Sequence, residues 1–317
     1  MDRIAIVGLG LIGRGWAIVF ARAGHAVRTF DVDPAALERG LAAIDASLHD
    51  LDDLGLLDEP AAAIRARIGP AGSLAEAVGD ADYVQESVAE TLAAKHEIFA
   101  ALDGLAPRQA VLASSTSTIP ASAFSEGLAG RDRCLVAHPA NPVHLIPVVE
   151  LVPAPWTDAA VVERTRVLLE AAGQSPVVVR KEIQGFILNR LQAALMSEAI
   201  NLWEGGYASA DDIDRTVRDG LGLRWSFMGP LETFDLAAPG GVVESGARYG
   251  PPFAQIVASQ AANAWSPATM TGLAAERETG QPRALLGERA RWRDRRLMQL
   301  LAHKRAAAAR EAARETR

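Results

Sequence analysis

A histidine and a glutamate twelve residues apart are the side chains of this sequence best suited to acid–base chemistry. His138 opens the loop 138–142, whose two prolines exclude a helix. Glu150 lies within the apolar run 148–152, which is typical of a strand. A carboxylate in such a run is costly to bury unless it is paired. A histidine held by it would be an oriented base able to remove the proton of an alcohol, although such a pair taken alone is more often structural.

A glycine-rich turn near the N-terminus favours a catalytic role for this pair. The apolar run 4–7 predicts a strand and residues 11–23 predict a helix, with a Gly-x-Gly-x-x-Gly fingerprint between them. The fingerprint consists of Gly8, Leu9, Gly10, Leu11, Ile12 and Gly13. Asp31 follows 18 residues after Gly13, at the end of the next predicted strand. A strand, a turn, a helix and a later acid in this order predict a dinucleotide site.

The chemistry of dinucleotide binding explains these residue types. A Cβ atom in the turn would block both the tight backbone and the approach of a pyrophosphate. The helix that starts at Leu11 would offer its free N–H groups to the phosphates. Asp31 would accept hydrogen bonds from the adenosine ribose and repel a 2′-phosphate, so NAD is favoured over NADP. FAD is a minor alternative.

The bulk properties exclude several other classes of protein. The chain has 317 residues, 49% of them hydrophobic, and a net charge of −7. This size allows two domains, and the negative charge argues against nucleic-acid or anionic-membrane binding. The single cysteine, Cys134, excludes a disulfide framework and is expected in the core. No apolar run is long enough to span a membrane and no signal peptide is recognised, so we expect a cytoplasmic protein. The six histidines show no metal-ligand spacing.

Hydrophobic patterns predict an α/β fold for the first part of the chain, a Rossmann-type doubly wound sheet. A helical insertion is expected over 34–67, and another helix near 158–172. The predicted strands are 4–7, 26–30, 83–87, 110–113, 134–137, 148–152 and 176–179.

The pattern changes after residue 181, and the remainder is predicted to be all helical. We therefore expect an NAD-binding domain over 1–181 and a helical substrate and dimerisation domain over 182–317. From Arg289 the chain is dense in Arg and Ala, which favours a solvated helix that frays at its end. The predicted helices are 184–204, 209–220, 230–238, 253–264, 268–279 and 282–313.

Five ordered segments carry a resemblance to a known family: Ser114–Thr118, His138–Pro142, Ile146–Val152, Gly185–Gln192 and Gly220–Glu232. Along nearly its whole length the chain resembles the 3-hydroxyacyl-CoA dehydrogenase superfamily, and its later motifs lean toward the lambda-crystallin / L-gulonate 3-dehydrogenase branch. This resemblance implies an NAD-dependent dehydrogenase that acts on a 3-hydroxyl group, with a helical second domain that forms a homodimer.

The resemblance also implies catalytic roles. His138 would be the general base, Glu150 would orient it, Ser117 would hydrogen-bond the substrate oxygen, and Asn189 would assist from the second domain. Ser117 follows a strand end where ligands collect in open α/β sheets, although a bond to loop backbone is equally compatible with it. Asn189 lies in an apolar segment and needs a buried partner, which neighbouring backbone could also supply.

Three further residues are less well defined. Glu90 and Lys95 match positions that the family places near the ribose and nicotinamide of the cofactor, but by sequence alone they would form a solvated pair. His144 belongs to no motif of the family, and we expect it at the surface or at the rim of a pocket.

Two features favour a free acid over a coenzyme A thioester. In the acyl-CoA relatives the insertion after the second strand helps to hold coenzyme A, but here it is acidic and would repel that anion. Its acids are Glu38, Asp45, Asp50, Asp52, Asp53, Asp58 and Glu59, against the single Arg39. Arg224 lies among apolar residues, where a buried guanidinium would need a substrate carboxylate or an internal acid such as Glu232.

The favoured substrate is therefore a small free 3-hydroxy acid such as L-gulonate. A 3-hydroxyacyl-CoA dehydrogenase is the main alternative. L-Carnitine is a minor one, since its trimethylammonium group would call for aromatic side chains such as Trp203, Trp225 and Tyr249. A non-enzymatic role, as a crystallin-like structural protein or an NAD sensor, is a third hypothesis.

Overall fold

The computed structural model describes residues 1–263 and 265–315, and these form two compact units. The first unit comprises Met1–Asn189 and Arg289–Arg317, and the second comprises Arg190–Glu288. Among the described residues, no helix combines the length and the apolar character needed to cross a membrane.

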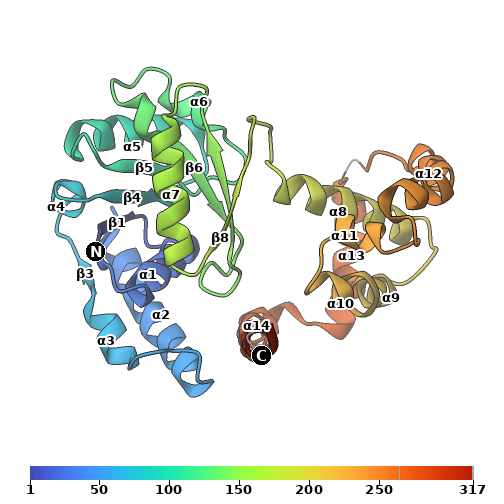
Figure 1. Cartoon of the computed structure of the whole chain (residues 1–317). Coiled ribbons are helices and arrows are strands. Elements are labelled where there is room, and N and C mark those ends of the chain that lie inside the picture. Colours follow the sequence, from blue (N-terminus) through green and yellow to red (C-terminus); the bar gives the residue numbers. More distant parts are fainter. Residues whose placement is uncertain (264, 316–317) are drawn as a thin grey trace. The chain divides into compact units, whose positions relative to one another are not determined.

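An eight-stranded sheet with the order β3-β2-β1-β4-β5-β6-β7-β8 forms the centre of the first unit (Figure 1). All neighbouring strands are parallel except β6 and β7. The strands are β1 (Arg3–Val7), β2 (Ala26–Phe30), β3 (Ile68–Pro70), β4 (Tyr83–Glu86), β5 (Val111–Ser114), β6 (Cys134–Pro139), β7 (Val148–Pro153) and β8 (Ser175–Val178). The predicted Rossmann-type sheet is thus confirmed, and the strand order reverses between β1 and β4, where such folds bind dinucleotides. The short edge strand β3 was not predicted.

Helices cover both faces of the sheet. In the first unit they are α1 (Leu11–Arg22), α2 (Pro34–Asp53), α3 (Ala61–Ala66), α4 (Leu74–Val78), α5 (Leu92–Leu105), α6 (Ala121–Ser125), η1 (Arg131–Arg133) and α7 (Ala159–Ala171). Side chains at their N-termini explain several helix starts, because Asp33, Ser73, Thr91 and Asp158 each accept a hydrogen bond from a backbone N–H of the first turn. Cys134 is buried in the core as expected, and burial raises the pKa of its thiol to about 12.

The C-terminal helix α14 (Leu286–Glu315) differs from the solvated helix that its composition predicts. From Arg289 onward it belongs to the first unit rather than to the helical second one. Met298 is buried in the core of that unit, and Leu297 and Leu301 pack against it. Arg295 lies 3.3 Å from Asp50 of α2. A narrow apolar stripe within an Arg- and Ala-rich helix is therefore enough to dock it, because neighbouring acids balance its charge.

The second unit is helical throughout its described residues. It begins within α8 (Leu188–Glu204) and continues through α9 (Ala210–Arg215), the π-helix η2 (Thr216–Leu221), α10 (Gly222–Trp225), α11 (Pro230–Asp235), α12 (Gly241–Ser259), α13 (Pro267–Gly280) and the 3₁₀-helix η3 (Arg283–Leu285). The sequence predicted only the end of α12, because Pro251 and Pro252 lie inside this helix.

Candidate active site

The glycine-rich turn lies between β1 and α1 and leaves space for a ligand beside its backbone. Gly8 has a φ of +90°, and a Cβ there would lie 2.6 Å from the Ser87 carbonyl oxygen. A Cβ on Gly13 would lie 1.8 Å from the Gly8 carbonyl oxygen, so the helix packs directly on the turn. A Cβ on Gly10 would meet nothing within 4 Å. Only glycine therefore fits at positions 8 and 13, and Gly10 leaves the backbone open to a phosphate.

The N-terminus of α1 and Asp31 complete the features expected of a dinucleotide site. No side chain caps α1, so the N–H groups of Leu11 and Ile12 are available to a pyrophosphate. Asp31 directly follows β2. Its carboxylate accepts hydrogen bonds from two backbone N–H groups, those of Leu9 at 2.8 Å and Asp33 at 3.0 Å.

A pocket of about 570 Å³ opens beside this turn, and it is large enough for the adenosine half of a dinucleotide. Its polar end is formed by Gly8, Gly10 and Asp31, and its apolar side by Val32, Leu74, Val88, Ala94 and Ile98. A carboxylate for the ribose beside an apolar slot for the base is the arrangement that NAD needs.

His138 and Glu150 lie directly opposite each other on β6 and β7. The antiparallel register pairs them, and His138 Nδ1 is 2.7 Å from Glu150 Oε2. Both side chains are buried. Because a carboxylate can only accept, Nδ1 carries the proton and Nε2 is left as the basic atom. The pairing seen in the sequence is thus an oriented imidazole at the carboxyl end of a strand.

The other oxygen of Glu150 is held by the turn that precedes α8. Glu150 Oε1 accepts hydrogen bonds from the backbone N–H groups of Ile187 at 2.7 Å and Leu188 at 2.9 Å. Burial alone would raise the pKa of Glu150, but the hydrogen bonds from His138 and these N–H groups outweigh it and lower the pKa. Glu150 therefore stays ionised and can stabilise a protonated His138.

Phe186 was not singled out from the sequence, yet it shapes this turn. It has a φ of +50° and follows Gly185, whose φ is +76°. Two successive left-handed residues precede the N–H groups that reach Glu150. The fully buried Phe186 ring also lies 5.5 Å from the His138 ring. A positive φ is unusual and strained for a bulky residue. Because Phe186 lies beside His138 and precedes the N–H groups that bind Glu150, we infer that this strain serves to hold the His138–Glu150 pair.

The structure brings Ser117 and Asn189 together, and the contact is made by the backbone of Ser117. Asn189 Nδ2 donates to the Ser117 carbonyl oxygen at 2.9 Å, so its partner lies 72 residues away rather than in neighbouring backbone. Ser117 follows β5, which pairs with β6 of His138. The structure thus places Ser117 just beyond the end of β5 and His138 near the end of the adjacent parallel strand β6.

Glu90 holds the loop that carries Ser117. Its Oε1 accepts hydrogen bonds from Thr116 Oγ1 at 2.7 Å, Ser117 N at 2.8 Å and Thr118 N at 3.2 Å. Burial by itself would raise the pKa of Glu90. These hydrogen bonds and the charge of Lys95 outweigh burial, so the net shift of the pKa is downward.

Lys95 is buried, so the expectation of a solvated pair with Glu90 is wrong. Only 1% of its surface is exposed, and Nζ lies 2.7 Å from Glu86 Oε1 and 3.7 Å from Glu90 Oε2. Glu86 also accepts a 2.6 Å hydrogen bond from Ser114 at the end of β5. Glu86 was not predicted as a site residue, because its one signal in the sequence is an acid near the end of the predicted strand 83–87. Lys95 thus links the ends of β4 and β5 to the Glu90 loop.

Arg224, in the second unit, is exposed rather than buried, and none of the described residues forms an ion pair with it, Glu232 included. The expectation of burial is wrong because its apolar neighbours Leu223 and Phe227 are themselves exposed. No group of three or more histidines, cysteines and acids among the described residues could hold a metal ion.

Comparison with known proteins now identifies the family. The model of the 3-hydroxyacyl-CoA dehydrogenase NAD-binding domain matches residues 3–183, more than half of the chain. The chain belongs to the 3-hydroxyacyl-CoA dehydrogenase family. The model of the C-terminal domain of the same family matches residues 185–279.

Individual members of the 3-hydroxyacyl-CoA dehydrogenase family show the range of its relatives. Lambda-crystallin of Oryctolagus cuniculus is 45% identical over 239 residues, which cover 75% of each chain. L-Carnitine dehydrogenase of Streptomyces coelicolor is 40% identical over 250 residues, 78% of each chain.

Two solved structures extend the comparison. The structure of 5-formyl-3-hydroxy-2-methylpyridine 4-carboxylic acid 5-dehydrogenase, an NAD⁺-dependent dismutase, has a TM-score of 0.81 and 30% identity, covering 96% of this chain and 98% of that one. Escherichia coli 3-hydroxybutyryl-CoA dehydrogenase has a TM-score of 0.65 and 34% identity, covering 74% of this chain and 49% of that one. The chain is thus an NAD-dependent oxidoreductase of this family that acts on a hydroxyl group.

Proposed function

We propose that the protein oxidises the 3-hydroxyl group of a small free 3-hydroxy carboxylic acid, as an L-gulonate 3-dehydrogenase does. The observation that carries the proposal is the buried His138–Glu150 pair, with Nδ1 bound at 2.7 Å and Nε2 left as the base. Ser117 lies beyond the neighbouring strand end, where it can hydrogen-bond the substrate oxygen.

The reaction requires that a proton and a hydride leave the same alcohol. His138 Nε2 takes the hydroxyl proton, and Glu150 stabilises the imidazolium that forms. The C3–H bond breaks as the C3–O bond becomes a carbonyl. Gly8, Gly10 and Asp31 would hold NAD⁺, which would supply the hydride acceptor. Asn189 fixes the Ser117 backbone and Glu90 fixes the loop around it, so both are positioning residues in this proposal.

Three observations support a free acid as substrate. Arg224 is an exposed guanidinium without an ion pair among the described residues, so it is available to a carboxylate. The relatives include L-carnitine dehydrogenase and a dehydrogenase named for a pyridine carboxylic acid, and both names denote free acids. The insertion over 34–67 is acidic, although ion pairs offset part of the negative charge that its composition suggests. Four of its acids form ion pairs with arginine: Asp45 with Arg65, Glu59 with Arg67, and both Asp50 and Asp53 with Arg295.

The main alternative is a 3-hydroxyacyl-CoA dehydrogenase, favoured by the likeness to 3-hydroxybutyryl-CoA dehydrogenase. Carnitine receives less support, because two of its three candidate aromatic residues have other partners. Trp203 donates to Glu276 at 2.5 Å, and the Tyr249 ring stacks on that of Phe253. A purely structural role would not need His138 and Glu150 paired in this way.

Replacing Arg224 with methionine tests the substrate class. We expect kcat/KM for a free 3-hydroxy acid to fall roughly tenfold or more, mainly through KM, since a charge-assisted bond to the carboxylate is lost. Turnover of the corresponding acyl-CoA thioester, which lacks that carboxylate, should change little. Steady-state kinetics of both substrates checks this, with Arg218→Met as the control in the same unit. An equal loss for both substrates, or none for the acid, would contradict the role of Arg224.

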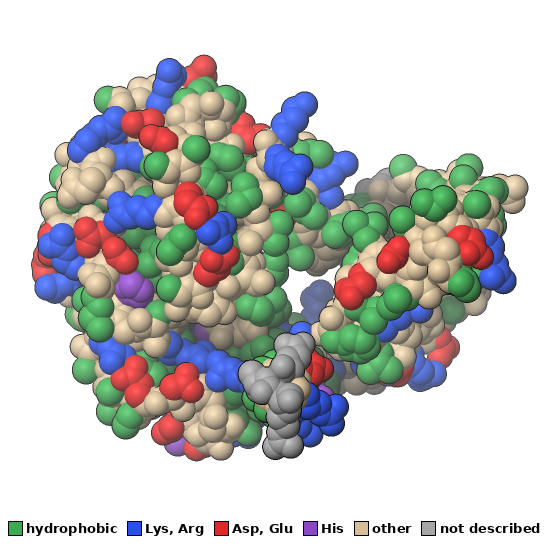
Figure 2. Space-filling model, viewed as in Figure 1, with side chains coloured by type: hydrophobic (Ala, Val, Ile, Leu, Met, Phe, Trp, Pro, Cys, Tyr) green, Lys and Arg blue, Asp and Glu red, His purple; other side chains and the backbone are tan. Residues whose placement is uncertain are grey.

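We also propose a homodimer formed through the second unit. Several large apolar side chains of this unit are between 65% and 81% exposed: Leu223, Phe227, Leu231, Val243 and Val257. Apolar surface is visible on this unit in the space-filling view (Figure 2). An exposed apolar surface on a helical unit is typical of a subunit interface.

Light scattering after size-exclusion chromatography tests the dimer. We expect a mass of about twice the 33.5 kDa of the chain. Phe227→Glu should shift the protein to monomer, because a charge would replace a buried apolar contact. Leu105→Glu, an exposed leucine of the first unit, is the matched control and should leave the mass unchanged. A wild-type monomer would rule out the proposed interface.

A further inference from the structure

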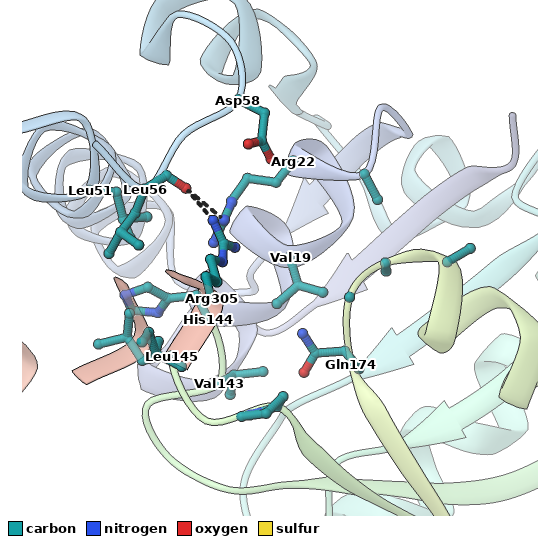
Figure 3. Close-up of a pocket in the computed structure, with 16 residues that line it drawn as sticks. Val19, Arg22, Leu51, Leu56, Asp58, Val143, His144, Leu145, Gln174 and Arg305 are labelled. Atoms are coloured by element: carbon teal, nitrogen blue, oxygen red, sulfur yellow. Dashed lines mark hydrogen bonds between the residues drawn. The ribbon is translucent and has the colours of Figure 1, made fainter. Parts of the chain in front are cut away.

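A second cavity of the first unit shares no lining residue with the nucleotide pocket. It has a volume of about 290 Å³ and lies between α1, the segment after α2, the loop 143–147, the turn after α7, and α14 (Figure 3). Its size is at the lower end of the range for small-molecule sites, which begins at about 300 Å³. The cavity therefore suits a small metabolite or an inorganic ion rather than a cofactor.

Two guanidinium groups converge at this cavity. Arg22 of α1 and Arg305 of α14 both donate to the Leu56 carbonyl oxygen, at 3.0 Å and 3.3 Å (Figure 3). Burial and the charge of Arg305 lower the pKa of Arg22, whereas Asp58 opposes this shift. Asp58 is the one acid that lines the cavity among the described residues. Two cations against this one acid give the cavity a net positive charge. Because the two guanidinium groups share one neutral acceptor, several of their N–H donors are left free.

Two residues that line the same cavity, His144 and Gln174, each carry a buried polar atom without a partner among the described residues. Within the described part of the chain, neither His144 Nδ1 nor Gln174 Oε1 has a hydrogen-bond partner. Buried polar atoms are nearly always paired, so a partner from outside the chain is indicated. Burial, and then the charges of Arg22, Arg14 and Arg293, lower the pKa of His144 to about 4. His144 is thus neutral near pH 7, and it can donate or accept one hydrogen bond according to its tautomer.

We propose that this cavity binds a small oxyanion, a carboxylate or phosphate group, through Arg22, Arg305, His144 and Gln174. Guanidinium groups form their strongest hydrogen bonds with such anions. The Gln174 amide can turn its NH₂ group toward the ligand, because its two ends have nearly the same shape. An anion bound between Arg22 and Arg305 joins α1 to α14, so it would stabilise the docking of the C-terminal helix. This inference does not depend on the substrate proposed above.

Binding of inorganic phosphate to the full-length protein tests the proposal. The titration is followed by calorimetry at constant ionic strength, with saturating NADH to keep the pyrophosphate site filled. A parallel titration uses acetate, a carboxylate without a hydroxyl group to oxidise, so that phosphate and carboxylate ligands are distinguished. We expect at least one of the two anions to bind at millimolar or lower concentration and to raise the melting temperature.

Two variants locate the binding. Arg305→Gln, on the exposed side of the cavity, should weaken the anion roughly tenfold or more. Arg310→Gln removes the same charge from the same helix outside the cavity and should leave binding unchanged. Gln174→Leu, which keeps both arginines, should also weaken binding. The proposal is overturned if neither anion binds the wild type, or if Arg305→Gln and Arg310→Gln bind the anion equally well.

Discussion

Replacing His138 with glutamine is expected to lower kcat by about 10²–10⁴-fold, while the protein still folds and binds NADH. The glutamine amide can still donate to Glu150 Oε2, which His138 contacts at 2.7 Å, so the buried carboxylate keeps a partner. What is lost is the basic nitrogen that takes the hydroxyl proton. Initial rates under saturating substrate, together with NADH binding by fluorescence, measure the two effects separately.

An exposed histidine elsewhere in the same unit provides the control. His49 lies on α2 with 76% of its side chain exposed, so His49→Gln should retain wild-type activity. Full activity of the His138 variant would disprove the assignment of the base. Loss of both turnover and NADH binding would mean that His138 supports the fold rather than the reaction.

Replacing Lys95 with methionine is expected to destabilise the protein by about 3–5 kcal/mol, because the carboxylate of Glu86 is then buried without its cation. Lys95 Nζ and Glu86 Oε1 are 2.7 Å apart, and both side chains are almost fully buried. The free energy of unfolding, measured by urea denaturation, checks the prediction.

A double variant separates the lost charge from the lost packing. Lys95→Met combined with Glu86→Gln leaves no buried charge, so it should recover much of the stability that the single variant loses. If Lys95→Met alone were as stable as the wild type, the ion pair would not contribute as proposed. Activity of the double variant should still be reduced if Lys95 also helps to position the loop held by Glu90.

The parts of the fold that depend on local sequence could be predicted. The glycine turn follows from the backbone demands of Gly8 and Gly13, which act within a few residues of each other. The pairing of His138 with Glu150 follows from two short strands joined by one loop, because an antiparallel register places them opposite each other. Neither prediction needed knowledge of distant contacts.

The features that depend on distant contacts could not be predicted. Lys95 pairs with an acid on a different element, and its local pattern is that of a surface residue. Helix α14 docks through a few residues around Met298 within a highly charged sequence, and its partners lie some 250 residues earlier. Arg224 was expected to be buried because its neighbours are apolar, but these neighbours are exposed in the single chain.

Initial rates of NADH formation with purified protein and NAD⁺ test the central claim most directly. The substrates to compare are L-gulonate, L-3-hydroxybutyrate, L-carnitine and L-3-hydroxybutyryl-CoA. We predict that a free acid is preferred over the thioester by at least about tenfold in kcat/KM, roughly 1.4 kcal/mol of transition-state discrimination. A preference for the thioester would contradict the proposed substrate class, and NADH binding without turnover of any of the four would favour a non-enzymatic role.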